Sequence, residues 1–315
     1  MNRERFSFLT HGWERTVLAA VLAAGLLAAC GGATDDEPAD GVRVVATTTI
    51  LGDLARNVIH DAGTVEVLLP VGADPHDYQA SSRQAAAVAE ADLVVANGLG
   101  LEEGLADLLG TAASDGVVVL EIAPLLDPIP FGADGQGQDP HVWLDPLRAA
   151  DGAAFIAESL ADIDPTIDWA TAADTYRAQL IEAHEQITTL LEPIPVARRR
   201  LVTNHDSLGY FAERYGFEII GTVVPGGATL AEPSSSALAA LVEAIERSDV
   251  PAIFADSTTP SQLAASVASE VDRDVAVVEL FTGSLGGADS PATTLIDLLL
   301  ENARRIALAL EPPPA

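Results

Sequence analysis

The sequence predicts an α/β protein of two lobes, each with a mostly parallel sheet, joined by a single long helix. Apolar and β-branched runs alternate with stretches of helical periodicity, first between residues 42 and 120 and again between 200 and 310. This alternation is typical of βαβ units, whose strands are parallel. Between the two series, residues 168–191 contain neither Pro nor Gly and space their apolar side chains as a helix does. That helix would extend roughly 36 Å, enough to run between two lobes.

The individual elements follow from local patterns. In the first series we expect strands at 42–48, 65–69, 93–96 and 117–120, and helices at 50–58, 82–91 and 101–109. In the second we expect strands at 200–203, 218–223, 252–255 and 275–280, and helices ending at 215 and covering 238–247, 261–271 and 295–310. Ligands of open parallel sheets bind beyond the carboxyl ends of the strands, so binding residues are expected in the loops that follow them.

Composition narrows the class of protein. A chain of 315 residues with 49% hydrophobic and 20% charged residues is globular and long enough for two domains. Its formal net charge of -31 argues against binding to nucleic acid, whose phosphates would be repelled. A cation is a natural partner for such a chain, although acidity also serves solubility.

The N-terminus has the order of an export signal. Three arginines precede an apolar run at 17–29 that is too short for a membrane span. The run ends at Cys30, the only cysteine, in a sequence that resembles the lipobox of bacterial lipoproteins. We therefore expect residues 1–29 to be a signal peptide and Cys30 to carry a lipid that anchors the exported protein to the outer face of the membrane. Residues 30–41 read as a flexible tether.

Three histidines stand out by their setting. The tripeptide Asp-Pro-His occurs twice, ending at His76 and at His141, and His205 follows a predicted strand. Neutral imidazoles brought together by loops can bind a transition metal. The alternative is that each is a lone structural histidine. His184 lies within a helical stretch, and we expect it at the surface or in helix packing. His60 is likewise not expected to bind the metal.

The second tripeptide has a stiff setting. Pro140 restricts the backbone before His141, and Trp143 with Leu144 can anchor the segment in apolar packing. Asp145 precedes a proline at the start of a predicted helix, where it is expected to cap the helix in preference to binding metal.

Several segments together resemble the metal-binding solute-binding proteins of ABC transporters, the cluster that captures zinc or manganese. They are Gly72–Tyr78, Ala96–Glu102, Asp139–Pro146, His205–Phe211 and Phe254–Ser257. They occur in the expected order, and the resemblance covers residues 42–311. The resemblance implies two Rossmann-like lobes joined by one rigid helix, with His76 and His141 as ligands from the first lobe and His205 from the second.

Two departures from the family concern the rest of the site. Gly283 stands where relatives often place an Asp ligand, and residues 134–138 lack the His-rich run of many zinc members. The fourth ligand is therefore expected to be water. Asp256 is the best protein candidate and Asp289 the second, although Asp256 could instead cap the helix after Pro260.

The leading interpretation is a monomeric binding protein that captures a divalent metal, zinc first and manganese second, and delivers it to an ABC permease in the membrane. The implied domains are an N-terminal lobe at 42–166, a linking helix at 167–192 and a C-terminal lobe at 193–311. A zinc-dependent hydrolase is one alternative, because three histidines and a water also form catalytic zinc sites. The sequence contains neither His-Glu-x-x-His nor Gly-x-Ser-x-Gly, so we expect no enzyme. A metal-stabilised adhesin is the other alternative.

Overall fold

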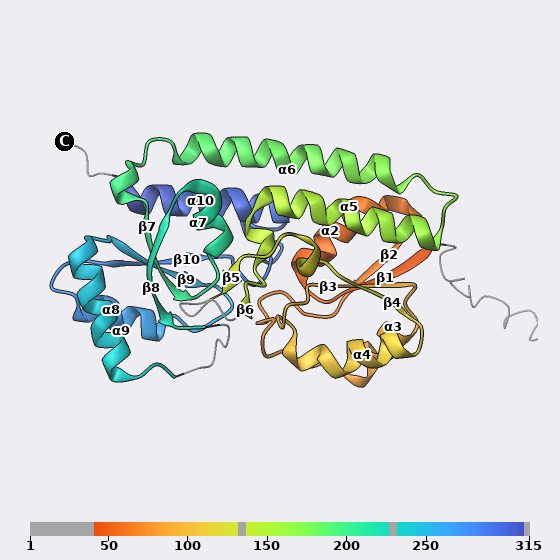
Figure 1. The fold of residues 1–315 in the computed structure, drawn as a ribbon, viewed down its shortest axis with the longest axis horizontal. Coiled ribbons are helices and arrows are strands. Elements are labelled where there is room, and N and C mark those ends of the chain that lie inside the picture. Colours follow the sequence, from red (N-terminus) through yellow and green to blue (C-terminus); the bar gives the residue numbers. More distant parts are fainter. Residues whose placement is uncertain (1–40, 132–136, 227–231, 312–315) are drawn as a thin grey trace, which may run out of the picture. The chain divides into compact units, whose positions relative to one another are not determined.

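The computed structural model describes residues 41–131, 137–226 and 232–311 (Figure 1). The expected signal peptide, Cys30 and nearly all of the tether lie outside the described residues. No helix in the described part of the chain is long and apolar enough to cross a membrane.

The first sheet has four parallel strands in the order β2-β1-β3-β4. They are β1 (Val42–Ala46), β2 (Gly63–Val67), β3 (Leu93–Ala96) and β4 (Val118–Glu121). All four residues of β3 are buried, as expected for an inner strand covered on both faces. The helices of this half are α2 (Thr49–Ile59), α3 (Ser82–Ala89), α4 (Ala106–Ser114) and α5 (Pro146–Ile163).

The expected helix at 101–109 begins later than its apolar spacing suggested. Gly98, Leu99 and Gly100 all have positive φ, so the chain leaves β3 through a left-handed turn that the helical pattern does not reveal. A short 3₁₀ turn at Glu103–Leu105 follows before α4 starts. The apolar side chain of Leu101 is buried without belonging to a helix.

The long helix is α6 (Trp169–Leu191), capped by the side chain of Asp168. Figure 1 shows it running along the molecule above α5 and α10 (Leu295–Leu310), and it packs against both of them and α2. Its buried residues repeat at helical spacing and are Trp169, Ala173, Tyr176, Leu180, Ala183, Ile187 and Leu191. The helix therefore shares packing with elements from both ends of the chain.

The second sheet also has four parallel strands, in the order β10-β9-β7-β8. They are β7 (Arg200–His205), β8 (Glu218–Val224), β9 (Ala252–Asp256) and β10 (Ala276–Leu280). Its helices are α7 (Gly209–Tyr215), α8 (Ser235–Ser248), α9 (Gln262–Glu270) and α10. The prediction of an α/β fold with two parallel sheets and a long helix between them is confirmed.

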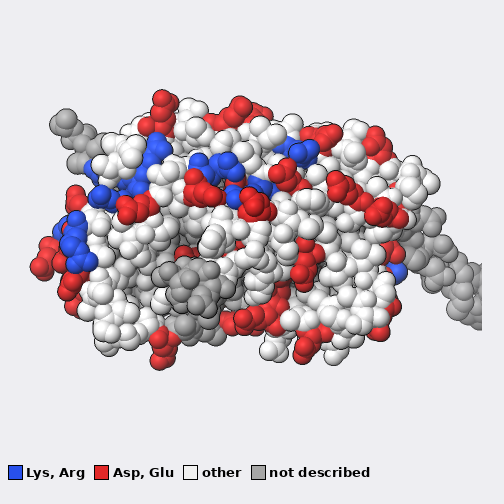
Figure 2. Space-filling view, viewed as in Figure 1, with Lys and Arg blue, Asp and Glu red and all other residues white. Residues whose placement is uncertain are grey.

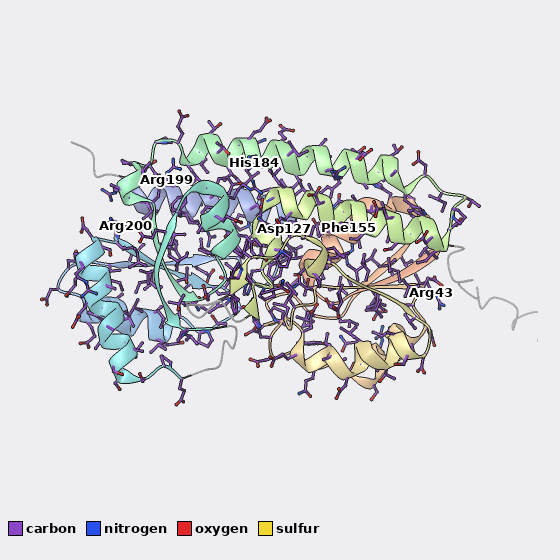
Figure 3. All side chains as sticks on the ribbon, viewed as in Figure 1. Arg43, Asp127, Phe155, His184, Arg199 and Arg200 are labelled. Atoms are coloured by element: carbon purple, nitrogen blue, oxygen red, sulfur yellow. The ribbon has the colours of Figure 1, made fainter. Side chains whose placement is uncertain are left out.

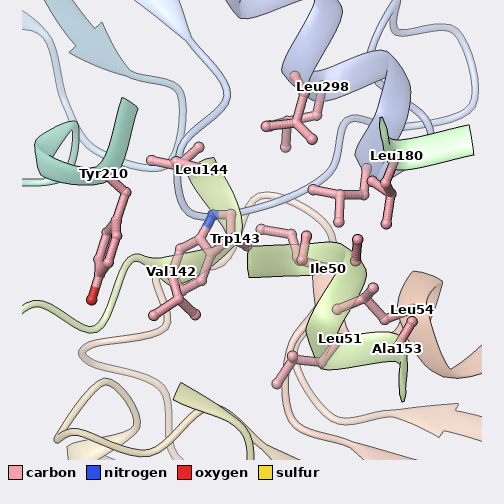
Figure 4. Packing of buried hydrophobic residues seen from close by; sticks show 14 of the residues in the cluster. Ile50, Leu51, Leu54, Val142, Trp143, Leu144, Ala153, Leu180, Tyr210 and Leu298 are labelled. Carbon is pink, nitrogen blue, oxygen red and sulfur yellow. The ribbon is translucent and has the colours of Figure 1, made fainter. Parts of the chain in front are cut away.

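One hydrophobic cluster connects the two halves. It includes Ile50 and Trp143 from the first half and Tyr210 and Leu298 from the second (Figure 4). A two-stranded antiparallel piece, β5 (Pro130–Phe131) with β6 (Gly137–Gln138), leads into the second Asp-Pro-His tripeptide. The sequence did not predict this piece, because Pro and Gly are typical of a loop.

Candidate metal centre

Three histidine side chains from distant parts of the chain meet in the structure. His76 lies in the loop after β2, His141 lies shortly before α5, and His205 is the last residue of β7. One ligand atom of each lies within 4.8 Å of the other two. The ring centroids are 5.5 Å apart for His76 and His141, 6.0 Å for His76 and His205, and 5.3 Å for His141 and His205. His205 was expected to follow the strand at 200–203, but β7 continues to it, and it pairs with Val224 of β8.

Each of these rings has a buried nitrogen without a hydrogen-bond partner among the described residues. These atoms are His76 Nε2, His141 Nε2 and His205 Nδ1. Burial, with the neighbouring imidazole as a further cause for His76, lowers the pKa of His76 and of His141 to about 4. Burial also lowers the pKa of His205. All three rings are therefore neutral at pH 7 and carry lone pairs, and a buried polar atom without a partner is costly unless something binds it.

The repeated tripeptide has one geometric role at both places. Asp74 Oδ1 accepts the backbone N–H of His76 at 3.0 Å, and Asp139 Oδ1 accepts that of His141 at 2.9 Å. Each aspartate thus closes a turn that fixes the backbone of the histidine two residues later. Asp139 Oδ1 also lies 2.7 Å from His141 Nδ1. Burial raises the pKa of Asp139, and the backbone N–H of His141 opposes that rise.

The segment Thr282–Ser284, which follows β10, holds the two histidine loops of the first half. Ser284 Oγ accepts the N–H of Gly72 at 2.9 Å, in the loop that carries His76. The indole of Trp143 donates to Thr282 O at 2.8 Å. Trp143 is buried, so its expected anchoring role is confirmed, with a hydrogen bond to the other half in addition.

Asp256, the tentative fourth ligand, is buried at the end of β9 but does not join the histidine group. Its Oδ2 lies 3.7 Å from His205 Nδ1, too far for a hydrogen bond. Its Oδ1 accepts the N–H of Thr258 at 2.8 Å. It does not cap the helix after Pro260 either, because α9 begins after Ser261 and has no side-chain cap. Asp256 therefore closes a local turn beside His205.

The other positions weighed from the sequence also lie outside the histidine group. Asp289 is exposed, and His60 is exposed at the end of α2. His184 lies on α6 (Figure 3), where its Nδ1 is 3.2 Å from the hydroxyl of Tyr215. Gly283 is buried, and a Cβ built on it would lie 3.1 Å from Thr258 Oγ1 and 3.3 Å from Pro75 Cδ.

The predicted capping role of Asp145 is confirmed. Its carboxylate accepts the N–H of Leu147 at 3.0 Å and caps α5. It also accepts from Arg148 at 2.8 Å and from Arg214 of α7 at 2.6 Å. The pair with Arg214 ties the first half to the second, 69 residues further along the chain.

Two contacts of the site were not predicted from the sequence. Asp139 contacts the ring of His141, which the repeat of Asp two residues before His could have suggested. Tyr210 donates from its hydroxyl to Asp139 O at 2.6 Å. No local spacing signals that contact, because the two residues are 71 positions apart.

Known proteins resemble this chain over nearly its whole length. The manganese-binding lipoprotein MntA of Halalkalibacterium halodurans is 30% identical over 304 residues, covering 96% of this chain and 97% of that protein. The zinc-binding protein TroA of Treponema pallidum is 29% identical, covering 93% and 98%. The solved structure of periplasmic TroA superposes with a TM-score of 0.80 at 26% identity, covering 86% of this chain and all of that one. The manganese-bound periplasmic metal-binding protein of Candidatus Liberibacter asiaticus gives 0.75 at 26%, covering 85% and 99%.

Residues 44–309 match the family described as zinc-uptake complex component A, periplasmic. That stretch contains both sheets, the long helix and the three clustered histidines. The description is that of a transport component and not of an enzyme. The chain belongs to the family of periplasmic zinc-uptake component A proteins.

Proposed function

We propose that this protein captures a divalent transition metal outside the cytoplasm, with zinc as the first choice and manganese as the second, and delivers it to an ABC permease for import. The observation that carries this proposal is the convergence of His76, His141 and His205, with one nitrogen of each within 4.8 Å of the others. A buried group of neutral imidazoles can bind a metal with no further chemistry. We assign these three residues as the protein ligands.

Zinc is preferred over manganese because of the ligand type. Three imidazole nitrogens suit zinc, whereas manganese favours more oxygen ligands. Within the described residues, the group that could hold a metal contains no carboxylate. The relatives are named for zinc and for manganese, so both metals belong in the test.

Metal binding is expected to stabilise a fold that already exists without metal. At a free zinc concentration of roughly 100 times the dissociation constant, the gain should be about 2.7 kcal/mol. For a protein of this size that corresponds to a rise in melting temperature on the order of 5 to 10 °C. Thermal melts of chelator-treated protein with added zinc measure the rise, and elemental analysis should find about one metal per chain, because one such group is present in the described part.

The rival functions give different results in the same experiments. A hydrolase would turn over ester or peptide substrates when loaded with zinc. A metal-stabilised adhesin would unfold when the metal is removed, because a purely structural site supplies folding energy. Either result would contradict this assignment. Manganese displacing zinc in direct competition would reverse the order of the two metals.

We propose that water fills the fourth coordination position of the metal. A carboxylate introduced at Gly283 tests this proposal. Gly283 lacks a positive φ, so an L side chain meets no backbone strain there. A Cβ at this position faces Pro75, which precedes His76, and Thr258. Gly283→Asp is therefore expected to strengthen metal binding and to raise the affinity for manganese relative to zinc, measured by competitive titration of both metals.

Matched variants separate ligand chemistry from packing. Gly283→Ala adds only the Cβ, which needs a shift of a few tenths of an ångström by Thr258, and should leave metal preference unchanged. Asp256→Asn keeps an oxygen for the Thr258 N–H and should cost less than about 10-fold in zinc affinity, the lower end of effects outside the ligand shell. A loss of 100-fold or more in Asp256→Asn would make that carboxylate the fourth ligand.

The family and the N-terminal sequence support export of the protein and its attachment to the membrane. The family description is periplasmic and one relative is a lipoprotein, which supports export and a lipid on Cys30. Cys30→Ser should then release the protein from the membrane fraction. We propose that a monomer acts, with lobes at 42–166 and 193–311 and a linking helix at 167–192, and limited proteolysis that cuts within 167–192 first would contradict a rigid link.

A further inference from the structure

We propose that Asp139 and Tyr210 act as a positioning pair that fixes the tautomer and orientation of His141, so that its Nε2 faces the metal before the metal arrives. This inference rests on the proposed function, because it concerns the ring of an assigned ligand. Neither residue is proposed to bind the metal. Asp139 acts through the imidazole, and Tyr210 acts through Asp139.

The carboxylate of Asp139 determines which ring nitrogen carries the proton. Its Oδ1 already accepts the backbone N–H of His141 at 2.9 Å and lies 2.7 Å from Nδ1 of the same residue. Oδ1 is placed to accept from both of these nitrogens of His141, and in that arrangement Nδ1 carries the proton. The lone pair is then on Nε2, the buried atom without a partner that faces the other two histidines.

Tyr210 holds Asp139 from the other half of the protein. Its hydroxyl donates to Asp139 O at 2.6 Å and accepts from the N–H of Ile129 at 3.3 Å. The N–H of Asp139 in turn donates to Ile129 O at 2.9 Å. The backbone of Asp139 is thus held on both sides, and Figure 4 shows the Tyr210 ring beside the segment that carries Val142 and Trp143.

The start of α7 packs directly on the same carboxylate. A Cβ built on Gly209 would lie 2.5 Å from Asp139 Oδ2, closer than real atoms approach. Any larger residue before Tyr210 would have to displace this carboxylate. The second half of the chain thus shapes the surroundings of a ligand that belongs to the first half.

Without Asp139, a buried neutral His141 could adopt the other tautomer, which presents an N–H to the metal and cannot bind it. Partners that orient metal-binding histidines are typically worth 10- to 100-fold in metal affinity. Asp139→Ala is therefore expected to weaken zinc binding by about 10- to 100-fold. Asp139→Asn should recover most of this loss, because its amide oxygen can still accept both N–H groups. Tyr210→Phe should cost several-fold, since only the hydroxyl that holds Asp139 is removed.

The experiment combines zinc titration against a competing chelator with long-range ¹H–¹⁵N spectra of the histidine rings. The matched control is Tyr215→Phe, on the same helix, whose hydroxyl contacts His184 instead of Asp139. We expect wild-type affinity for the control, and for the metal-free wild type a His141 ring protonated only at Nδ1. Asp139→Ala should show both tautomers.

Two results would overturn the inference: an Nε2-protonated His141 in the metal-free wild type, or Asp139→Ala within about 3-fold of wild type in zinc affinity. If Asp139→Ala does not fold, Tyr210→Phe decides the matter, since equal affinities of Tyr210→Phe and Tyr215→Phe contradict the positioning role. Failure of the proposed function is distinguishable, because it would appear as absent zinc binding in the wild type, whereas the tautomer is read without metal.

Discussion

Alanine in place of His76, His141 or His205 is expected to lower zinc affinity by about 100-fold or more in each case. Residues that merely orient a ligand are worth 10- to 100-fold, so removal of the ligand itself should cost more. Each variant leaves two nitrogens and a cavity that water must fill. Competition with a chromophoric chelator measures the loss, and the melting temperature of the metal-free protein shows whether the fold survives.

His60→Ala and His184→Ala are the controls for this series. His60 is exposed, and His184 is partly buried against Tyr215, outside the group that meets at the proposed site. Both variants should bind zinc as the wild type does. A comparable loss in His184→Ala would contradict the assignment, and so would wild-type affinity in any one of the three ligand variants.

Most of the fold could be predicted, because its strands and helices have local sequence patterns such as apolar runs and capping residues. The four buried residues of β3 form an uninterrupted apolar run, and Asp168 marks the start of α6 directly. The errors arise where the backbone departs from these patterns. The turn at Gly98–Gly100 has positive φ at every residue and delays the next helix, although the apolar spacing already looks helical.

The proposed ligands could be predicted from the sequence, but most of the residues that hold them could not. The histidines are marked by residue type and by the repeated tripeptide, whose aspartates act locally on the residue two positions later. The contacts of Tyr210 with Asp139 and of Arg214 with Asp145 join residues about 70 positions apart. Such pairs depend on how the two sheets are placed by α6 and the shared core. No pattern within one element encodes them.

The position of Asp256 illustrates the same limit. The sequence made it the best protein candidate for a fourth ligand, and it lies buried at the end of β9 with its Oδ2 3.7 Å from His205 Nδ1. The direction of its carboxylate depends on the turn that follows, where the N–H of Thr258 takes one oxygen. Sequence alone could not choose between ligand, helix cap and turn.

Asp145→Ala is expected to destabilise the protein by about 3 kcal/mol or more, because it removes both a helix cap and the hydrogen bonds to two arginines. Its side chain is completely buried and accepts hydrogen bonds from Leu147, Arg148 and Arg214. Loss of a helix cap costs about 1 kcal/mol. Loss of hydrogen bonds between charged groups costs about 1.5 to 3 kcal/mol each, reduced here because Arg214 remains partly exposed and Arg148 keeps Glu213 as a second partner.

A matched control lies on the same helix. Asp151 pairs with Arg177 at 3.2 Å, but its side chain is 60% exposed, so Asp151→Ala should change stability by less than about 1 kcal/mol. Figure 2 shows most of the basic side chains on this face in a band with acidic side chains among them. Both variants replace an aspartate by alanine. The two aspartates differ in their burial and in whether they contact α7.

Urea denaturation of the metal-free protein measures both variants, and zinc titration of the same samples separates stability from binding. Asp145→Ala should unfold at clearly lower urea than Asp151→Ala, with zinc affinity within a few-fold of wild type, because Asp145 is committed to α5 and Arg214 and is absent from the histidine group. Asp145→Asn should fall between wild type and Asp145→Ala, since it keeps the cap but loses the charge. Equal stability of the two alanine variants would show that the contact between Asp145 and Arg214 does not hold the halves together. A 100-fold loss of zinc affinity in Asp145→Ala would instead make this carboxylate part of the metal site.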